Sequence, residues 1–161
     1  MKLIISRLFI VSICIWLICA CTEQQQVNNF VKGSFENIQK HYQGKAYLIM
    51  FWSEDCAYCM KELEQFGQTL QQHPEINLIT VATDPFLDKD TIRSTLASFN
   101  LQQMEAWVFA MPHAETLYFD VDKRWRGELP LTFLFDEHHK KTKITGLITE
   151  EVFLAWLTKN D

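Results

Sequence analysis

Cys56 and Cys59 are the residues of this 161-residue chain best suited to chemistry, because two thiols three residues apart can form and break a disulfide. They follow a continuously apolar run, residues 46–52, and precede residues 63–70, where apolar side chains recur at helical spacing. The pair is therefore predicted where a buried strand gives way to a helix. The positive end of a helix dipole lowers the pKa of a thiol. We expect Cys56 to be the attacking thiolate and Cys59, one turn further on, to resolve the mixed disulfide.

Other chemistries find little support in the sequence. A zinc site needs four ligands, and the nearest candidates for a second pair, His138 and His139, lie in a predicted turn at the wrong end of their strand. No order of Ser, His and Asp and no phosphate-binding loop stands out. The formal net charge of −5 argues against nucleic acid as a partner. We therefore predict chemistry that uses no metal and no cofactor.

Residues 1–20 have the features of an export signal. Cations precede an apolar run, residues 8–18, that is too short for an ordinary membrane-spanning helix. The signal ends in the sequence ICAC, which resembles the lipobox of bacterial lipoproteins, so Cys21 is predicted to carry lipid. Cys19 is unusual within a lipobox, and an uncleaved membrane anchor is the alternative.

The segment that follows is polar and rich in Gln, and residues 21–33 are predicted to form the lipidated N-terminus and a flexible tether. Removal of the signal would also remove Lys2 and Arg7, leaving 13 basic and 20 acidic side chains. Membrane attachment would then depend on the lipid rather than on a polybasic patch. Either anchor places the domain in a bacterial cell envelope, facing the periplasm or the extracytoplasmic side.

The remaining chain, residues 34–161, is predicted to form one α/β domain, since 48% of the sequence is hydrophobic and can fill a core. Its first half alternates strands and helices, which predicts parallel strands, and its second half ends in a hairpin and a helix. The expected helices are 34–44 with Ser34 as N-cap, 56–73, 88–99, 112–119 with Pro112 in the first turn, and 150–159 with Thr149 as cap. The expected strands are 46–52, 76–82, 106–110, 131–135 and 143–145.

Two segments far apart in the chain carry a resemblance: WSEDCAYC, residues 52–59, and LPLTFLFD, residues 129–136. Together they resemble the thioredoxin superfamily, and they are most similar to the TlpA/ResA-type membrane-tethered thiol-disulfide oxidoreductases, over roughly residues 35–161. The resemblance implies a thioredoxin-like three-layer α/β/α fold with a mixed central sheet. It also implies a strand–helix insertion in the middle of the chain.

The resemblance assigns a substrate-binding surface. In this family the proline that opens the third strand is cis and faces the cysteine pair, which would make Pro130 that residue and put Leu129 beside Cys56. The backbone N–H and C=O of the residue before such a proline can pair with an extended peptide. The substrate-binding residues that follow are Trp52, Ala57, Tyr58, Leu129 and Pro130.

Glu62 is the third candidate catalytic residue, because members of this subgroup often carry Glu three residues after the second cysteine. A partly buried carboxylate one helical turn from Cys59 could take the thiol proton during attack on the mixed disulfide. Thioredoxin itself uses a buried aspartate on the first strand, and the matching residue here is Met50. The alternative is that Glu62 is a solvated helix-surface residue, paired with a lysine.

Two departures from the family pattern bear on specificity. The residues between the cysteines, Ala57 and Tyr58, include neither the Pro of reducing thioredoxins nor the His of strong oxidants, so the direction of electron flow stays open. Where the family often has Gly two positions before the cis-proline, this chain has Glu128. Its charge near the substrate groove could exclude acidic partners.

The leading hypothesis is an envelope thiol-disulfide oxidoreductase that reduces disulfides of exported client proteins such as apocytochromes. The resemblance implies that an integral-membrane electron donor re-reduces it. One alternative is a disulfide oxidase or isomerase, and another is a non-catalytic thioredoxin-fold lipoprotein that binds partners or delivers metal. We expect a monomer, because no dimerisation region is evident.

Overall fold

The computed structural model describes residues 24–160. The predicted signal, residues 1–20, and the predicted lipidation site, Cys21, lie outside the described residues. In chain order the elements are β1 (Val27–Phe30), α2 (Ser34–His41), β2 (Tyr47–Trp52), α3 (Ala57–Thr69), β3 (Asn77–Ala82), α4 (Lys89–Ser98), β4 (Glu105–Phe109), α5 (Ala114–Val121), β5 (Leu131–Phe135), β6 (Lys141–Thr145) and α6 (Glu150–Asn160).

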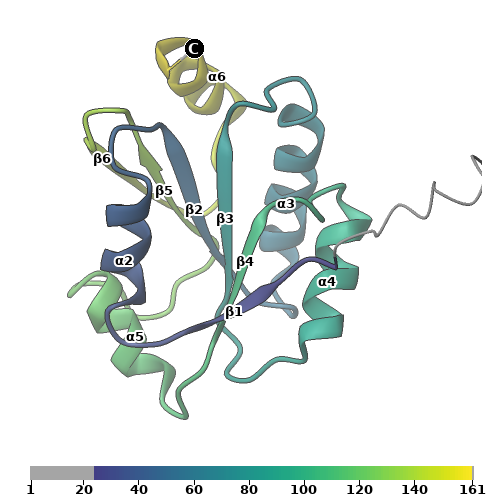
Figure 1. Ribbon diagram of the computed structural model, residues 1–161, viewed down its shortest axis with the longest axis vertical. Coiled ribbons are helices and arrows are strands. Elements are labelled where there is room, and N and C mark those ends of the chain that lie inside the picture. Colours follow the sequence, from purple (N-terminus) through teal and green to yellow (C-terminus); the bar gives the residue numbers. More distant parts are fainter. Residues whose placement is uncertain (1–23, 161) are drawn as a thin grey trace, which may run out of the picture.

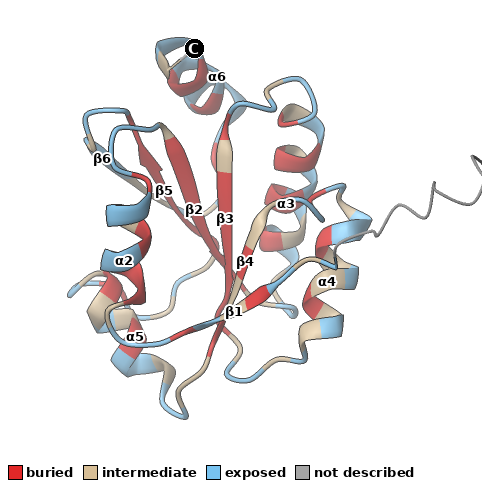
Figure 2. Ribbon diagram, viewed as in Figure 1, coloured by how far each residue is buried: buried red, intermediate tan, exposed pale blue. Residues whose placement is uncertain are grey.

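The strands form one mixed sheet in the order β1-β4-β3-β2-β5-β6 (Figure 1). The pairs β1–β4, β4–β3 and β3–β2 are parallel, whereas β2–β5 and β5–β6 are antiparallel. Every residue of β2 and of β5 is buried, as continuous apolar runs in a sheet covered on both faces should be. The polar β6 lies at an edge, where its side chains reach water (Figure 2).

Helices cover both faces of this sheet. Alternate residues of β2 point to opposite sides: Leu48, Met50 and Trp52 join a core cluster with α3, α4 and α6, while residues 47, 49 and 51 join a second cluster with α2 and α5. Figure 1 shows α2 and α5 on one side of the sheet and α3 and α4 on the other. The expected three-layer α/β/α arrangement is confirmed, and β4 with α5 supplies the expected strand and helix in the middle of the chain.

Two expected helix starts differ in detail. Gly33, with φ of 85°, is the N-cap of α2, and Ser34 is the first helical residue, its hydroxyl oxygen accepting a hydrogen bond from the Val31 N–H at 2.9 Å. Pro112 lies before α5, whose N-cap is His113. The expected cap of α6 is confirmed, because the Thr149 hydroxyl oxygen accepts from the N–H of the third residue after it at 3.3 Å.

The predicted tether is wrong from its middle onward. β1 pairs in parallel with β4, with Val27 opposite Ala106 and Phe30 opposite Phe109, so the domain begins before residue 34. The preceding Gln25 donates hydrogen bonds to the carbonyls of residues 101 and 104. β1 is an edge strand of four residues, and only two of its side chains are buried. So short a hydrophobic pattern does not distinguish a strand from a polar linker in the sequence.

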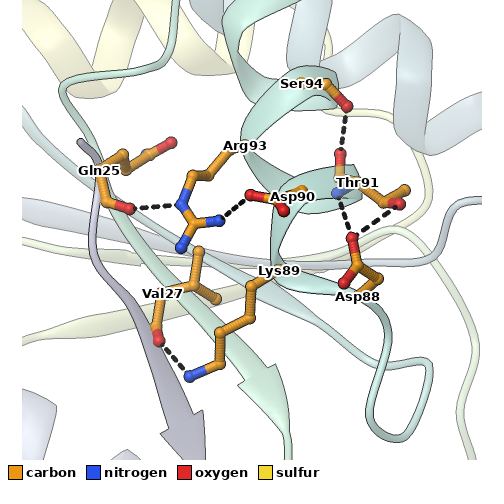
Figure 3. A network of polar contacts seen from close by, with 8 residues as sticks. All are labelled: Gln25, Val27, Asp88, Lys89, Asp90, Thr91, Arg93 and Ser94. Atoms are coloured by element: carbon orange, nitrogen blue, oxygen red, sulfur yellow. Dashed lines mark hydrogen bonds and ion pairs between the residues drawn. The ribbon is translucent and has the colours of Figure 1, made fainter.

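Helix α4 holds this N-terminal strand through cations bound to backbone oxygens (Figure 3). The Arg93 guanidinium donates to the carbonyl of Gln25 at 2.9 Å and also pairs with Asp90. The Lys89 ammonium donates to the carbonyl of Val27 at 2.7 Å. These contacts join the start of the domain to α4, and β1 is therefore an integral part of the sheet edge.

Replacing Arg93 by Ala should loosen β1, because it removes the charged donor that holds the Gln25 carbonyl. We expect faster hydrogen–deuterium exchange at the amides of residues 27–30 and a loss of about 1–2 kcal/mol in the free energy of unfolding. Lys40→Ala is the matched control, since its pair with Glu36 is exposed, and it should cost at most about 0.5 kcal/mol. Amides of residues 27–30 that exchange at unstructured rates in the unaltered protein would contradict the strand.

Candidate active site

Cys56 and Cys59 form a disulfide at the junction of β2 and α3, with their Cα atoms 5.2 Å apart. Cys56 is the N-cap of α3, and its Sγ accepts a hydrogen bond from the Cys59 N–H at 3.1 Å. No acidic residue lies in the first turn of the helix, so its positive end is free to favour a thiolate at Cys56. Cys56 is half-buried and Cys59 is fully buried. The first cysteine is therefore the more accessible of the two, and the attacking and resolving roles stay a prediction.

The peptide bond between Leu129 and Pro130 is cis. It lies at the same end of the sheet as the disulfide, where β2 ends and β5 begins. β2 and β5 run antiparallel with Phe51 opposite Leu131, so the residues that follow β2 and those that precede β5 meet there. The Pro130 carbonyl accepts from the Gly146 N–H at 2.8 Å. Within residues 24–160 the backbone N–H and C=O of Leu129 have no hydrogen-bond partner. Its N–H and C=O are thus available to an extended peptide.

Trp125 supports the segment that precedes Pro130. Its indole is 1% exposed and packs against the rings of Phe51 and Tyr118, with centroids 4.9 and 4.5 Å away. The indole N–H donates to the Glu128 carbonyl at 2.9 Å. Gly127 is required beside it, because a Cβ there would lie 2.8 Å from the Tyr118 ring and φ is 96°. Helix α5, through Tyr118, therefore helps to place the segment before the cis-proline.

Glu62 is completely buried, which excludes the surface alternative. Its Oε1 accepts a hydrogen bond from the Thr132 hydroxyl at 2.8 Å, and its Oε2 has no protein partner. Burial raises the pKa of Glu62 to about 7, and the bond from Thr132 opposes part of that rise. Thr132 lies opposite Met50 in the β2–β5 pair, so the carboxyl group reaches the neighbourhood of Met50 from the helix. A carboxyl group with this pKa can gain and lose a proton at neutral pH.

Asp84, which the sequence did not single out, orders the loop between β2 and α3. Its Oδ1 accepts from the Ser53 hydroxyl at 2.8 Å and its Oδ2 from the Glu54 N–H at 2.9 Å. The neighbouring Thr83 donates to the Trp52 carbonyl from both its N–H and its hydroxyl. A signal was present, because polar residues at the carboxyl ends of parallel strands are where sites of open α/β sheets concentrate.

The remaining predicted substrate-binding residues differ in exposure. Ala57 is exposed, and the Tyr58 side chain is 61% exposed between the two cysteines. Leu129 is half-buried, whereas Pro130 is buried. Trp52 is fully buried in the core cluster beneath α3, so its side chain supports the site and does not line the exposed surface.

Neither a metal centre nor a membrane span is found within residues 24–160. No group of three or more His, Cys, Asp or Glu side chains there is arranged to hold a metal ion. Each helix in the described range is too short or too polar to cross a bilayer. His138 and His139 lie in the turn between β5 and β6, as expected.

The fold is thioredoxin-like, with the disulfide at the start of α3. A secreted disulfide oxidoreductase of Mycobacterium tuberculosis, described as homologous to DsbE of E. coli, superposes with a TM-score of 0.60 at 15% identity, covering 74% of this chain and 85% of the other. A thiol:disulfide interchange protein of Chlorobium tepidum gives 0.59 at 14% identity, over 76% and 83% of the two chains. StoA of Bacillus subtilis gives 0.52 at 21% identity, over 71% and 84%. No model of a known family and no curated protein matches the sequence.

The buried carboxyl group predicts how stability depends on pH. The folded-state pKa of Glu62, about 7, lies above the value of 4.5 for an unperturbed glutamate, so the folded protein keeps a proton that the unfolded chain releases between these values. The free energy of unfolding of the oxidised protein should therefore fall as pH rises from 4.5 to 7 and then level off. The contribution of this group is on the order of 3 kcal/mol.

Glu62→Gln should remove that dependence, as measured by urea unfolding at several pH values. Glu64→Gln is the matched control: the residue lies on the same helix but is exposed, and its replacement should leave the slope unchanged. Unfolding curves of the parent protein and Glu62→Gln that shift in parallel with pH would show that Glu62 does not titrate in this range.

Asp84→Asn should loosen the loop before Cys56, because an amide has one accepting oxygen where the carboxylate has two. We expect a loss of about 1 kcal/mol in the free energy of unfolding and faster amide exchange at Glu54. The control is Asp55→Asn, which changes an exposed carboxylate without a hydrogen-bond partner and should leave both quantities nearly unchanged. Equal amide exchange at Glu54 in both variants would contradict the role given to Asp84.

Proposed function

We propose that this protein is a thiol-disulfide oxidoreductase of the bacterial cell envelope that reduces disulfides of exported proteins. The observation that carries the proposal is the Cys56–Cys59 disulfide at the start of α3, with its first sulfur accessible, its second buried, and the cis Leu129–Pro130 bond at the same edge of the sheet. The similar solved structures support it, since several are described as disulfide oxidoreductases or thiol:disulfide interchange proteins.

In the proposed reaction the reduced Cys56 thiolate attacks one sulfur of a client disulfide. A Cys56–client disulfide forms, the client S–S bond breaks, and the second client sulfur leaves as a thiolate that takes up a proton. Glu62 then accepts the Cys59 proton, and the Cys59 thiolate attacks Cys56 Sγ, which expels the first client sulfur. The client gains two electrons and two protons, and the cysteine pair becomes oxidised. A dithiol donor must return those two electrons.

The setting proposed for this reaction rests mainly on the sequence. The signal-like residues 1–20 and the lipobox-like Cys21 support a lipid-anchored protein on the extracytoplasmic side, and one similar structure is of a secreted protein. The donor proposed is an integral-membrane electron carrier, the clients are proteins such as apocytochromes, and the protein acts as a monomer. Reduction is the leading hypothesis, although the residues between the cysteines leave the direction of electron flow open; an oxidase would use the same bonds in reverse.

The equilibrium reduction potential of the full-length chain in detergent tests the proposal. Titration against defined thiol buffers, followed by tryptophan fluorescence, should give a value near roughly −270 mV, as for reducing thioredoxins. A value near roughly −120 mV would mean an oxidant. A value well below about −300 mV would mean a structural disulfide and would overturn the catalytic role.

Single cysteine variants provide the control for mechanism. Cys59→Ser should accumulate a mixed disulfide with a client peptide, because the resolving thiol is gone, and Cys56→Ser should not, because Cys59 is buried. Mass spectrometry of the non-reduced protein would detect the adduct. Equal trapping by both variants would contradict the assignment of Cys56 as the attacking residue.

A further inference from the structure

The surface in front of Cys56 carries carboxylates that no cation neutralises. Glu54 and Asp55 immediately precede the cysteine and are exposed, and within residues 24–160 neither side chain has an ion-pair or hydrogen-bond partner. Asp84 lies behind them, and both of its oxygens are held by neutral donors, the Ser53 hydroxyl and a backbone N–H. Three negative charges therefore stand on the β2 side of the site.

A fourth carboxylate lies on the segment that precedes Pro130. Glu128 precedes Leu129, its side chain is exposed, and its Oε2 accepts from the Arg126 N–H at 2.9 Å. Hydrogen bonding to backbone N–H groups, with nearby cations, lowers the pKa of Glu128. This residue is therefore ionised at neutral pH and faces whatever peptide pairs with Leu129.

Basic side chains near the site are fewer than the carboxylates. The Lys143 ammonium pairs with Asp122 at 3.1 Å and also acts on Glu128. The Lys61 ammonium lies over the Tyr58 ring, 5.6 Å from its centroid. The Arg126 guanidinium donates to the carbonyls of Lys123 and Trp125. Three segments border the site: 52–61, 83–86 and 126–131. Together they contain four carboxylates and two cations, Lys61 and Arg126. The rim of the site is thus net negative.

Activation of the attacking thiol does not explain this charge. A helix N-terminus stabilises a thiolate, whereas carboxylates beside it act in the opposite direction. Glu54 and Asp55 contribute no hydrogen bond of their side chains to the fold, so stability does not explain them either. A contact with a client of opposite charge explains why these carboxylates lie beside Cys56.

Exposed apolar side chains accompany the charges. Tyr58 is 61% exposed between the cysteines, and Phe86, two residues after Asp84, is 62% exposed. Leu147 is 40% exposed and follows Gly146, whose N–H binds the Pro130 carbonyl, so it flanks the proline. Large apolar side chains at the mouth of a site offer contact area to an apolar side chain of a ligand.

We propose that Glu54, Asp55 and Glu128 select the client: an extended polypeptide segment in which basic residues flank the reactive cysteine and an apolar residue lies nearby. This inference rests on the proposed function and names its substrate class. The free N–H and C=O of Leu129 suit an extended backbone. Charge complementarity at an interface rim acts mainly on the association rate and is screened by salt.

The test compares two disulfide peptides that differ only in the residues flanking the cysteine, Lys on both sides or Glu on both sides. Reduced full-length protein in detergent is mixed with each, and rate constants are divided by those for dithiothreitol, which corrects for the intrinsic reactivity of each peptide. We expect the basic peptide to react at least about tenfold faster at low ionic strength. The ratio should shrink towards one in 1 M salt, where the Debye length is about 3 Å.

A triple variant, Glu54→Gln, Asp55→Asn and Glu128→Gln, should lower the low-salt ratio to less than about threefold. The matched control removes three exposed carboxylates elsewhere, Glu64, Glu137 and Glu151, each changed to Gln, and should keep the ratio of the parent protein. A control triple that loses the ratio equally would mean that net charge alone selects the client, and would overturn the assignment to the rim.

An uncharged disulfide, bis(2-hydroxyethyl) disulfide, separates failure of this inference from failure of the proposed function. If the protein reduces this compound but reacts equally with both peptides, or faster with the acidic one, the inference is wrong and the proposed function stands. If neither this compound nor either peptide reacts with Cys56, the proposed function fails first, and the inference that depends on it fails too.

Discussion

The hydrogen bond from the Thr132 hydroxyl to Glu62 is the contact on which the arrangement of the site depends. It joins α3, which carries both cysteines, to β5, which begins directly after Pro130. A buried carboxyl group without a charged partner is costly, and an apolar side chain of similar size would stabilise a core more simply. With its pKa raised to about 7, Glu62 is about half protonated near pH 7. Its retention within the core is better explained by proton transfer than by stability.

Segments from different parts of the chain form the site, at the end of the sheet where β2 and β3 finish and β5 begins. The loop after β2 carries Cys56, and the segment before β5 carries Pro130. Asp84, two residues after the end of β3, orders the loop after β2. Parallel and antiparallel strand directions bring these three points together. The inserted strand and helix add a fourth support, because Tyr118 of α5 packs against Trp125, which holds the Glu128 carbonyl. An insertion remote in sequence thereby takes part in placing the segment before the cis-proline.

The charged groups at this end of the sheet are of two kinds, buried and exposed. In the proposed reaction the helix dipole and the buried Glu62 act on the sulfur atoms and their protons, and Glu62 is shielded from solvent ions. Glu54, Asp55 and Glu128 lie outside, where salt screens them, and they concern what approaches. Because the two kinds of group are separate, substitutions of the exposed carboxylates would change the choice of clients and leave the thiol-disulfide exchange itself unchanged.

Local patterns in the sequence were sufficient for the elements after β1 and for the reactive pair. The spacing of Cys56 and Cys59 after an apolar run, and the Leu129-Pro130 motif before another, place the chemistry because strand and helix periodicity are written within ten to fifteen residues. The same local signals predicted the parallel first half and the antiparallel hairpin, which the strand pairing confirms. Glu62 was a candidate through the family resemblance, yet the sequence could not decide whether its face of the helix met water or the sheet.

Tertiary structure decided what depends on contacts between distant residues. β1 is a strand because β4 offers its free edge and α4 offers Arg93 and Lys89, contacts more than sixty residues away in the chain. Asp84 orders the active-site loop for the same kind of reason, thirty residues from the groups it binds. The sequence by itself determined which residues can react, because chemistry belongs to side chains and their near neighbours. Only the folded chain decided which carboxyl group is buried and which is exposed, because burial depends on the packing of the whole chain.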